Sequence, residues 1–186
     1  MDALNAQIDK EETELVEKAK TNDVAFEELY ERYFPKIFGY IFKRVGDKQN
    51  TEDIVSTTFM KAFSALPRYE NKEVPFGAWL FTIATNNLTD FYRTQARKKE
   101  VAIDYVQDKA DEQINIEQSI DNSFDNKKLR SIIECLPSPY QEVINLRFFA
   151  ELSNIEISRV LNLSPAHVGV LIYRALKKCN KLYENV

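Results

Sequence analysis

Apolar residues recur three or four positions apart along most of this chain, and this spacing restricts the fold more than any other feature of the sequence. No segment shows the alternating apolar pattern, typical of a β-strand, that would compete with this helical spacing. The clearest stripe is rich in aromatic residues and comprises Phe26, Leu29, Tyr30, Tyr33, Phe34, Ile37, Phe38, Ile41 and Phe42. We therefore expect an all-α fold.

The first half of the chain predicts three helices. Pro35 lies inside the aromatic stripe and should kink or interrupt the first of them. Thr51 is the expected N-cap of the second helix, which Pro67 should end. After a polar loop over residues 68–75, the apolar spacing resumes at Phe76 and predicts a third long helix.

In the second half, serine residues indicate where helices begin. Ser138 precedes a proline and has Gln141 three residues later, which predicts a capping box. Ser153 and Glu156 have the same spacing and predict a second capping box.

A helix-turn-helix is expected next, because only Asn162, Leu163 and Ser164 separate the last two helices. Asparagine tolerates the left-handed backbone that such a tight turn needs. The final helix then carries basic residues that suit contacts with phosphate groups, namely Arg174, Lys177, Lys178 and Lys181.

Charge divides the chain into segments, although the net charge is only −4. Residues 1–31 hold ten acidic and three basic residues, and residues 100–127 hold eight acidic and two basic ones. The second acidic segment lacks a sustained apolar period. We interpret it as a linker between two small helical domains, residues 1–99 and 128–186.

Several classes of function are disfavoured by what the chain lacks. The two cysteines, Cys135 and Cys179, have no metal-ligand spacing, and His167 is the only histidine, so we expect no metal site. Four glycines cannot form a phosphate-binding loop or a dinucleotide fingerprint, so we expect no cofactor and no enzyme. Without a membrane span or a signal peptide, a cytoplasmic protein with no membrane insertion is expected.

Four stretches resemble, in order, the regions of extracytoplasmic-function sigma factors, which belong to the sigma-70 family of bacterial RNA polymerase subunits. The opening of region two is similar to FEELYERYFPKIFGYIFKRVGD, and its polymerase-binding helix to TEDIVSTTFMKAFSAL. Its promoter-melting helix is similar to PFGAWLFTIATNNLTDFYR. Region four is similar to LPSPYQEVINLRFFAELSNIEISRVLNLSPAHVGVLIYRALKK.

The resemblance implies a promoter-specificity subunit without a catalytic residue of its own. Its partners would be core RNA polymerase, through the clamp helices and the flap, promoter DNA, and an anti-sigma factor. The implied polymerase-binding residues are Asp53, Ile54, Ser56, Thr57 and Phe59. Those implied for the minus-ten element are Arg68, Tyr69, Asn71, Lys72, Asn86, Asn87, Arg93 and Arg97. Those implied for the minus-thirty-five element are Ser164, Ala166, His167, Tyr173, Arg174 and Lys177.

The chain departs from the family pattern in two places. Family members commonly carry glutamine and an acid at the positions of Ser56 and Thr57. The recognition helix usually has a basic residue, a small residue and often an arginine where this chain has Gly169, Val170 and Leu171. At those three positions no side chain can offer a hydrogen bond or a charge to DNA.

Two other functions are compatible with these patterns. One is a conventional helix-turn-helix regulator that binds duplex DNA without polymerase. The other is a sigma-like interaction protein that occupies polymerase or a regulator without directing transcription. Single residues also have simpler interpretations: Trp79 as a core side chain, and Arg93 as the partner of Asp90 in a surface ion pair.

Overall fold

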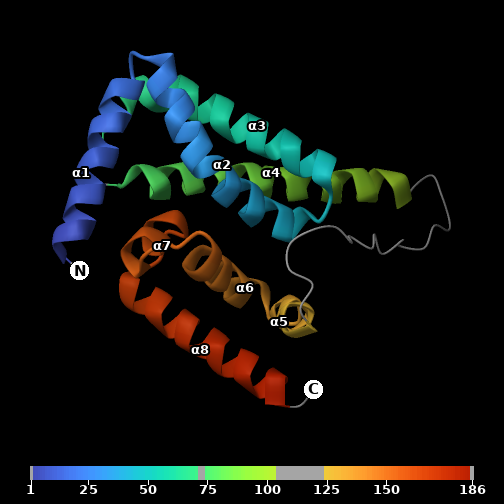
Figure 1. The fold of residues 1–186 in the computed structure, drawn as a ribbon. Coiled ribbons are helices and arrows are strands. Elements are labelled where there is room, and N and C mark those ends of the chain that lie inside the picture. The colour runs from blue at the N-terminus through green and yellow to red at the C-terminus, as the bar shows by residue number, and fades with distance from the viewer. Residues whose placement is uncertain (1, 71–73, 104–123, 185–186) are drawn as a thin grey trace. The chain divides into compact units, whose positions relative to one another are not determined.

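The computed structural model describes residues 2–70, 74–103 and 124–184, and every regular element in these ranges is helical (Figure 1). The all-α prediction is confirmed. The chain divides into two compact units between residues 114 and 115. In the ranges described, no helix has both the length and the apolar character needed to cross a membrane.

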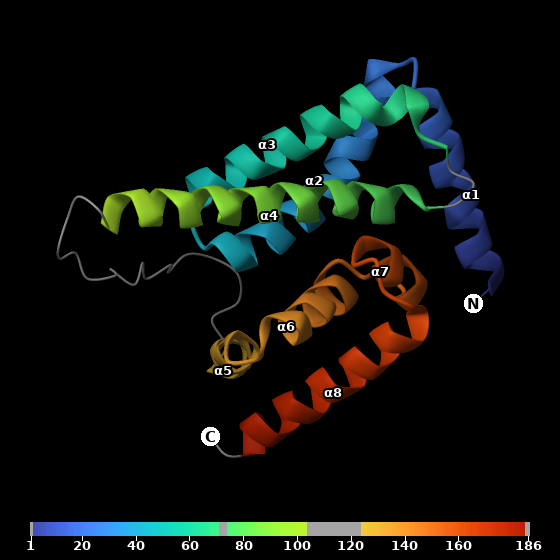
Figure 2. The ribbon, with the colours of Figure 1, turned by 180° about the vertical axis from the view of Figure 1, so that it is seen from behind.

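The described residues of the first unit form four α-helices, α1 (Asp2–Ala19), α2 (Asp23–Val45), α3 (Lys48–Ala65) and α4 (Phe76–Ile103). A short 3-10 helix, η1 (Leu66–Arg68), follows α3. Helix α2 packs against the other three, and α3 and α4 lie side by side (Figures 1 and 2). The largest fully buried side chains of this unit are Val16, Leu29, Ile37, Tyr40, Ile41, Val55, Leu66, Phe76, Leu80 and Phe81. They form a core to which every helix of the unit contributes.

Helix α2 runs without interruption through Pro35, so an interruption is wrong, and the alternative, a kink, stays a prediction. Tyr33 and Ile37 are buried on either side of the proline. Their packing offsets the backbone hydrogen bond that proline cannot donate.

Helix α3 begins earlier than the sequence indicated, and its N-cap is Asp47 rather than Thr51. The Asp47 carboxylate accepts a hydrogen bond from the Asn50 backbone N–H at 2.7 Å. Gly46 ends α2 in the left-handed region at φ 74°, so two residues turn the chain from one helix into the next. Thr51 is buried inside α3 and donates its hydroxyl hydrogen to the Asp47 carbonyl at 2.6 Å.

The second unit consists of α5 (Phe124–Glu134), α6 (Ser138–Ile144), a π-helical turn η2 (Asn145–Phe149), α7 (Asn154–Val160) and α8 (Pro165–Glu184). Helix α8 packs against α5, α6 and α7. The core of the second unit includes Val143, Leu146, Ile157, Val168 and Ala175.

The capping predictions in this unit have mixed outcomes. The box between Ser153 and Glu156 is present, with both reciprocal hydrogen bonds. The box between Ser138 and Gln141 is wrong, because the Gln141 amide instead donates to the Glu134 carbonyl at the end of α5 and to the Leu136 carbonyl just beyond it. The last carbonyls of a helix have no partner within it, so the amide gains more by capping α5.

The tight turn between α7 and α8 has the expected geometry. Asn162 adopts a left-handed conformation with φ 53°. The Ser164 hydroxyl accepts a hydrogen bond from the His167 backbone N–H at 3.2 Å and caps α8.

The expected linker, residues 100–127, overlaps both neighbouring helices, because α4 extends to Ile103 and α5 begins at Phe124. The acidic stretch between them, residues 104–123, lies outside the described residues.

Candidate functional site

The outer face of α3 presents three of the five residues implied in polymerase binding. Asp53, Ser56 and Thr57 are exposed. Ile54 and Phe59 are only 7% and 5% exposed and pack inward. This face therefore offers one carboxylate and two hydroxyl groups to a partner, on a helix held by its apolar side.

Beside this face, α2 and α3 form an apolar groove with a volume of about 450 Å³. Its lining residues are Phe26, Tyr30, Phe34, Glu52, Val55, Ser56, Phe59, Met60 and Phe63. Rings contact one another across the groove, with centroids 4.9 Å apart for Phe26 and Phe63 and 4.6 Å apart for Tyr30 and Phe59. We call this feature the α2–α3 groove.

The aromatic stripe of α2 thus serves two sides of the helix. Tyr30, Phe34, Phe38 and Phe42 form a ladder of rings with centroids 5.3–5.7 Å apart, outside the fully buried core. The groove was not predicted from the sequence. The signal was the width of the stripe, which exceeds what one buried helix face needs.

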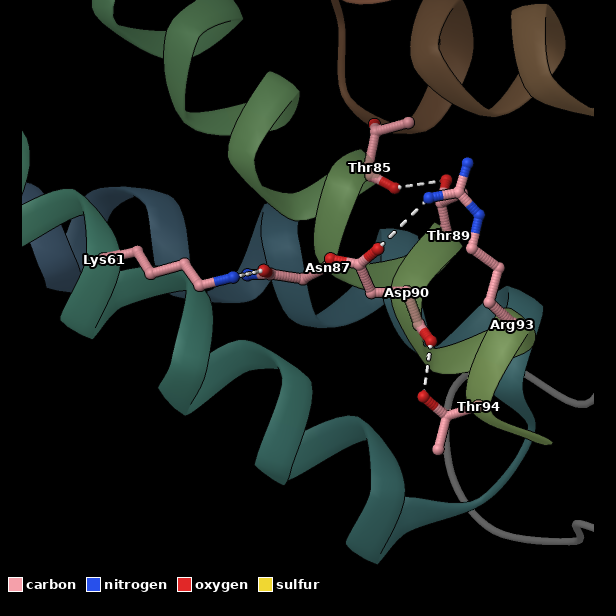
Figure 3. A network of polar contacts seen from close by, with 7 residues as sticks. All are labelled: Lys61, Thr85, Asn87, Thr89, Asp90, Arg93 and Thr94. Carbon is pink, nitrogen blue, oxygen red and sulfur yellow. Dashed lines mark hydrogen bonds and ion pairs between the residues drawn. The ribbon is translucent and has the colours of Figure 1, made fainter. Parts of the chain in front are cut away.

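The two adjacent asparagines of α4 have different environments. Asn86 is exposed, whereas Asn87 is 6% exposed and points toward α3 (Figure 3). The Asn87 amide donates to the Thr58 hydroxyl at 2.9 Å and accepts from the Lys61 ammonium. The amide therefore joins α3 to α4 and is withdrawn from any external ligand.

The two arginines of α4 that the sequence singled out are both exposed. Arg93 and Asp90 form the anticipated ion pair at 3.5 Å, with side chains 70% and 63% exposed (Figure 3). So exposed a pair contributes little to stability. Arg93 can therefore leave Asp90 for a phosphate group at small cost, and Arg97 lies one turn further along the same helix.

Tyr69 lies between α3 and α4 and is buried. Its hydroxyl donates to the Val74 carbonyl, and its ring contacts Trp79 with centroids 4.7 Å apart. Burial is the main cause that raises the pKa of the Tyr69 phenol above its ordinary value. The neighbouring Arg68 is exposed.

Asn71 and Lys72, also implied in minus-ten binding, lie outside the described residues. The ring of Trp79 contacts Phe76 as well as Tyr69, and its side chain is half-buried.

Helix α8 and the residue that caps it, Ser164, present all six residues implied for the minus-thirty-five element. Each of them is exposed: Ser164, Ala166, His167, Tyr173, Arg174 and Lys177. Val168 and Ala175 are fully buried on the opposite side and fix which face of the helix is outward. This outward face is basic toward its C-terminal end.

Comparisons with known proteins agree with this geometry. The family model of Sigma-70 region 2 matches residues 29–98, and that of Sigma-70 region 4 matches residues 126–179. The ECF RNA polymerase sigma factor BldN of Streptomyces coelicolor is 33% identical over 170 residues, which are 91% of this chain and 64% of BldN. This chain thus spans less than two thirds of the length of BldN.

A second relative, the ECF RNA polymerase sigma factor SigM of Bacillus subtilis, is 29% identical over 86% of this chain and 96% of its own length. Among solved structures, CnrH in complex with the cytosolic domain of CnrY matches with a TM-score of 0.68 and 25% identity, over 94% of this chain and 97% of CnrH. Both sigma regions therefore occur here in the order found in these relatives. The chain belongs to the sigma-70 family of RNA polymerase sigma factors, in its extracytoplasmic-function group.

Proposed function

We propose that this chain is a sigma subunit that brings core RNA polymerase to a promoter and opens the DNA there. The observation that carries the proposal is the presence of regions 2 and 4 on one chain, each with an exposed face of the required chemistry. The subunit needs no catalytic residue, because polymerase performs the synthesis. The part of the expected linker (residues 100–127) that lies between α4 and α5 would let the two domains bind separate promoter elements.

The outer face of α3 is the proposed docking surface for the clamp helices of polymerase. Asp53, Ser56 and Thr57 make the direct contacts. Ile54 and Phe59 support that face from inside the core. Because the two hydroxyl groups carry no charge, Asp53 supplies the electrostatic part of this contact.

The outward side of α4 is the proposed binding surface for the melted minus-ten strand. Single-stranded DNA needs cations for its phosphates and polar or aromatic groups for its bases. Arg93, Arg97 and Arg68 supply the cations, and Asn86 supplies a polar group for a base. Tyr69 and Asn87 are buried and stabilise the fold of this unit instead of contacting DNA.

Helix α8 is the proposed reader of the minus-thirty-five element, with its N-terminal half in the major groove. Arg174 and Lys177 lie one and two helical turns after Val170, where they can contact phosphate groups. The proposed contact with the flap of RNA polymerase is made by the same domain, residues 128–186.

The α2–α3 groove is the proposed binding site for an anti-sigma factor. CnrH, a structural relative, is in complex with the cytosolic domain of CnrY. An apolar groove lined by aromatic rings and Met60 suits the apolar face of a partner helix.

The direct test is size-exclusion chromatography with bacterial core RNA polymerase, followed by promoter opening with the fraction that elutes together. We expect co-elution and opening. Co-elution without opening would favour the sigma-like interaction protein, and tight DNA binding without co-elution would favour the stand-alone regulator.

Two variants test the surfaces, each with a matched control. Asp53→Ala should weaken co-elution, whereas Glu31→Ala, an exposed acid on α2, should not. Arg93→Ala should reduce opening. Lys48→Ala, which removes the cation of another exposed helical ion pair, should leave opening unchanged.

A further inference from the structure

Val170 lies in the middle of the outward face of α8. Its side chain is 45% exposed, although Val168 and Ala175 on the opposite side are fully buried. With 3.6 residues per helical turn, the positions that share the outward face with Val170 are Ala166, Tyr173, Arg174 and Lys177. The residue nearest the centre of the DNA-facing surface is therefore aliphatic.

An aliphatic side chain restricts what Val170 can recognise. It has no donor or acceptor, so it cannot form a hydrogen bond to a base edge. In the major groove, the one apolar group that a base presents is the C5-methyl group of thymine. Ala166 and the ring of Tyr173, which is 67% exposed, extend the same apolar surface to either side of Val170.

Gly169, the neighbour of Val170 in the chain, has no side chain, and the packing of α8 does not explain why. A Cβ atom added there would meet only the Asn154 side-chain nitrogen, at 3.8 Å, which is an ordinary contact. Packing therefore does not require glycine, and glycine weakens a helix by roughly 1 kcal/mol relative to alanine. No side chain at Gly169 therefore competes with Val170 for contact with a ligand.

The charge around this apolar surface favours DNA as its ligand. Arg174, Lys177 and Lys178 are exposed on α8. The helix carries no acidic residue between Pro165 and Tyr183. On DNA, the apolar patch would contact a base edge, and the cations that follow it along the helix would contact the neighbouring phosphate groups.

We propose that Val170, flanked by Ala166 and Tyr173, determines minus-thirty-five specificity by contacting thymine methyl groups. The inference rests on the proposed sigma function. Ala166 and Tyr173 are seven residues apart, or about 10 Å along the helix, which corresponds to roughly three base pairs. The preferred element therefore contains thymine, on either strand, within a window of about three base pairs.

The experiment uses the full chain assembled with core polymerase. Promoter fragments with a randomised minus-thirty-five element are first selected for opening. Each thymine of the selected element is then replaced by deoxyuridine, which removes only the methyl group. We expect at least one replacement to weaken promoter binding about fourfold, the value of one buried methyl group.

The protein variants assign this effect to Val170. In the Val170→Ala holoenzyme, replacing thymine by deoxyuridine should leave promoter binding nearly unchanged. Leu176→Ala is the matched control, because Leu176 is also 45% exposed on α8 but lies about one third of a turn away. It should keep the full penalty.

Three results would overturn the inference: a selected element without thymine, no deoxyuridine penalty at any position, or a penalty that Val170→Ala leaves intact. Each of them is seen only with a holoenzyme that opens promoters, so the sigma function would stand. If no fragment of the library is opened, the sigma function fails first and the inference fails with it.

Discussion

The two adjacent asparagines of α4 test whether one residue of the first unit serves stability and its neighbour serves promoter opening. Asn87→Ala should destabilise the fold and leave promoter opening intact while the unit is folded. Asn86→Ala should do the reverse, since Asn86 is exposed and is proposed to face a base. The two changes remove the same chemical group one residue apart.

The contacts of Asn87 set the magnitude. Its amide makes two hydrogen bonds, and each contributes about 1 kcal/mol. The Thr58 hydroxyl would still donate to the Ile54 carbonyl at 2.7 Å, and exposed Lys61 would turn to water, so neither group is left without a partner. The small void adds about 1 kcal/mol. The total of roughly 2–3 kcal/mol lowers Tm by roughly 10–20 °C in a unit of this size.

The assay can follow this unit alone, because Trp79 is the only tryptophan in the chain and lies in α4. Thermal unfolding measured by its fluorescence should show the loss for Asn87→Ala and a change within about 0.5 kcal/mol for Asn86→Ala. Promoter opening, measured well below both transitions, should fall about five- to tenfold for Asn86→Ala only, the value of one hydrogen bond. If opening fell instead in folded Asn87→Ala and stayed normal in Asn86→Ala, the division would be refuted.

Four further predictions concern stability. Gly39→Ala should stabilise the first unit by about 0.5–1 kcal/mol, because nothing lies within 4 Å of the added Cβ. Gly77→Ala should destabilise it by about 1–2 kcal/mol, since its Cβ would lie 2.9 Å from the hydroxyl of buried Tyr33; urea titrations of Trp79 fluorescence would rank the pair. The raised pKa of Tyr69 means that the unfolded chain loses this proton first, so stability should fall as pH rises above 10, and less steeply in Tyr69→Phe. Ser153→Ala should cost about 1 kcal/mol by removing the N-cap of α7, and circular dichroism of thermal unfolding would measure the loss.

The helical class, the order of the helices and the turn between α7 and α8 could be predicted because each depends on neighbouring residues. Asn162 and Ser164 show this, since a left-handed residue and an N-cap act within one turn of helix. Gln141 shows the limit. Its spacing from Ser138 fits a capping box, but its amide reaches the end of the preceding helix, and only the fold decides between two partners that local sequence allows.

Which of the proposed site residues are exposed could not be predicted from the sequence. A helix puts Ile54 and Asp53 within one turn, and the sequence alone does not say which of them faces a partner. The structure resolves this by packing Ile54 and Phe59 inward. It likewise exposes Asn86 and buries Asn87, although the two side chains are chemically identical.

The aromatic stripe of α2 shows why helical periodicity alone underestimates a binding protein. Periodicity counts apolar residues on a face and does not say whether that face meets the chain itself or another molecule. Here Ile37 and Ile41 are fully buried in the core, whereas Tyr30 and Phe34 line the α2–α3 groove. A helix that only stabilised its own unit would gain nothing from a second apolar face in contact with water, and such faces mark sites of association. The width of the stripe is therefore better explained by a partner than by the fold.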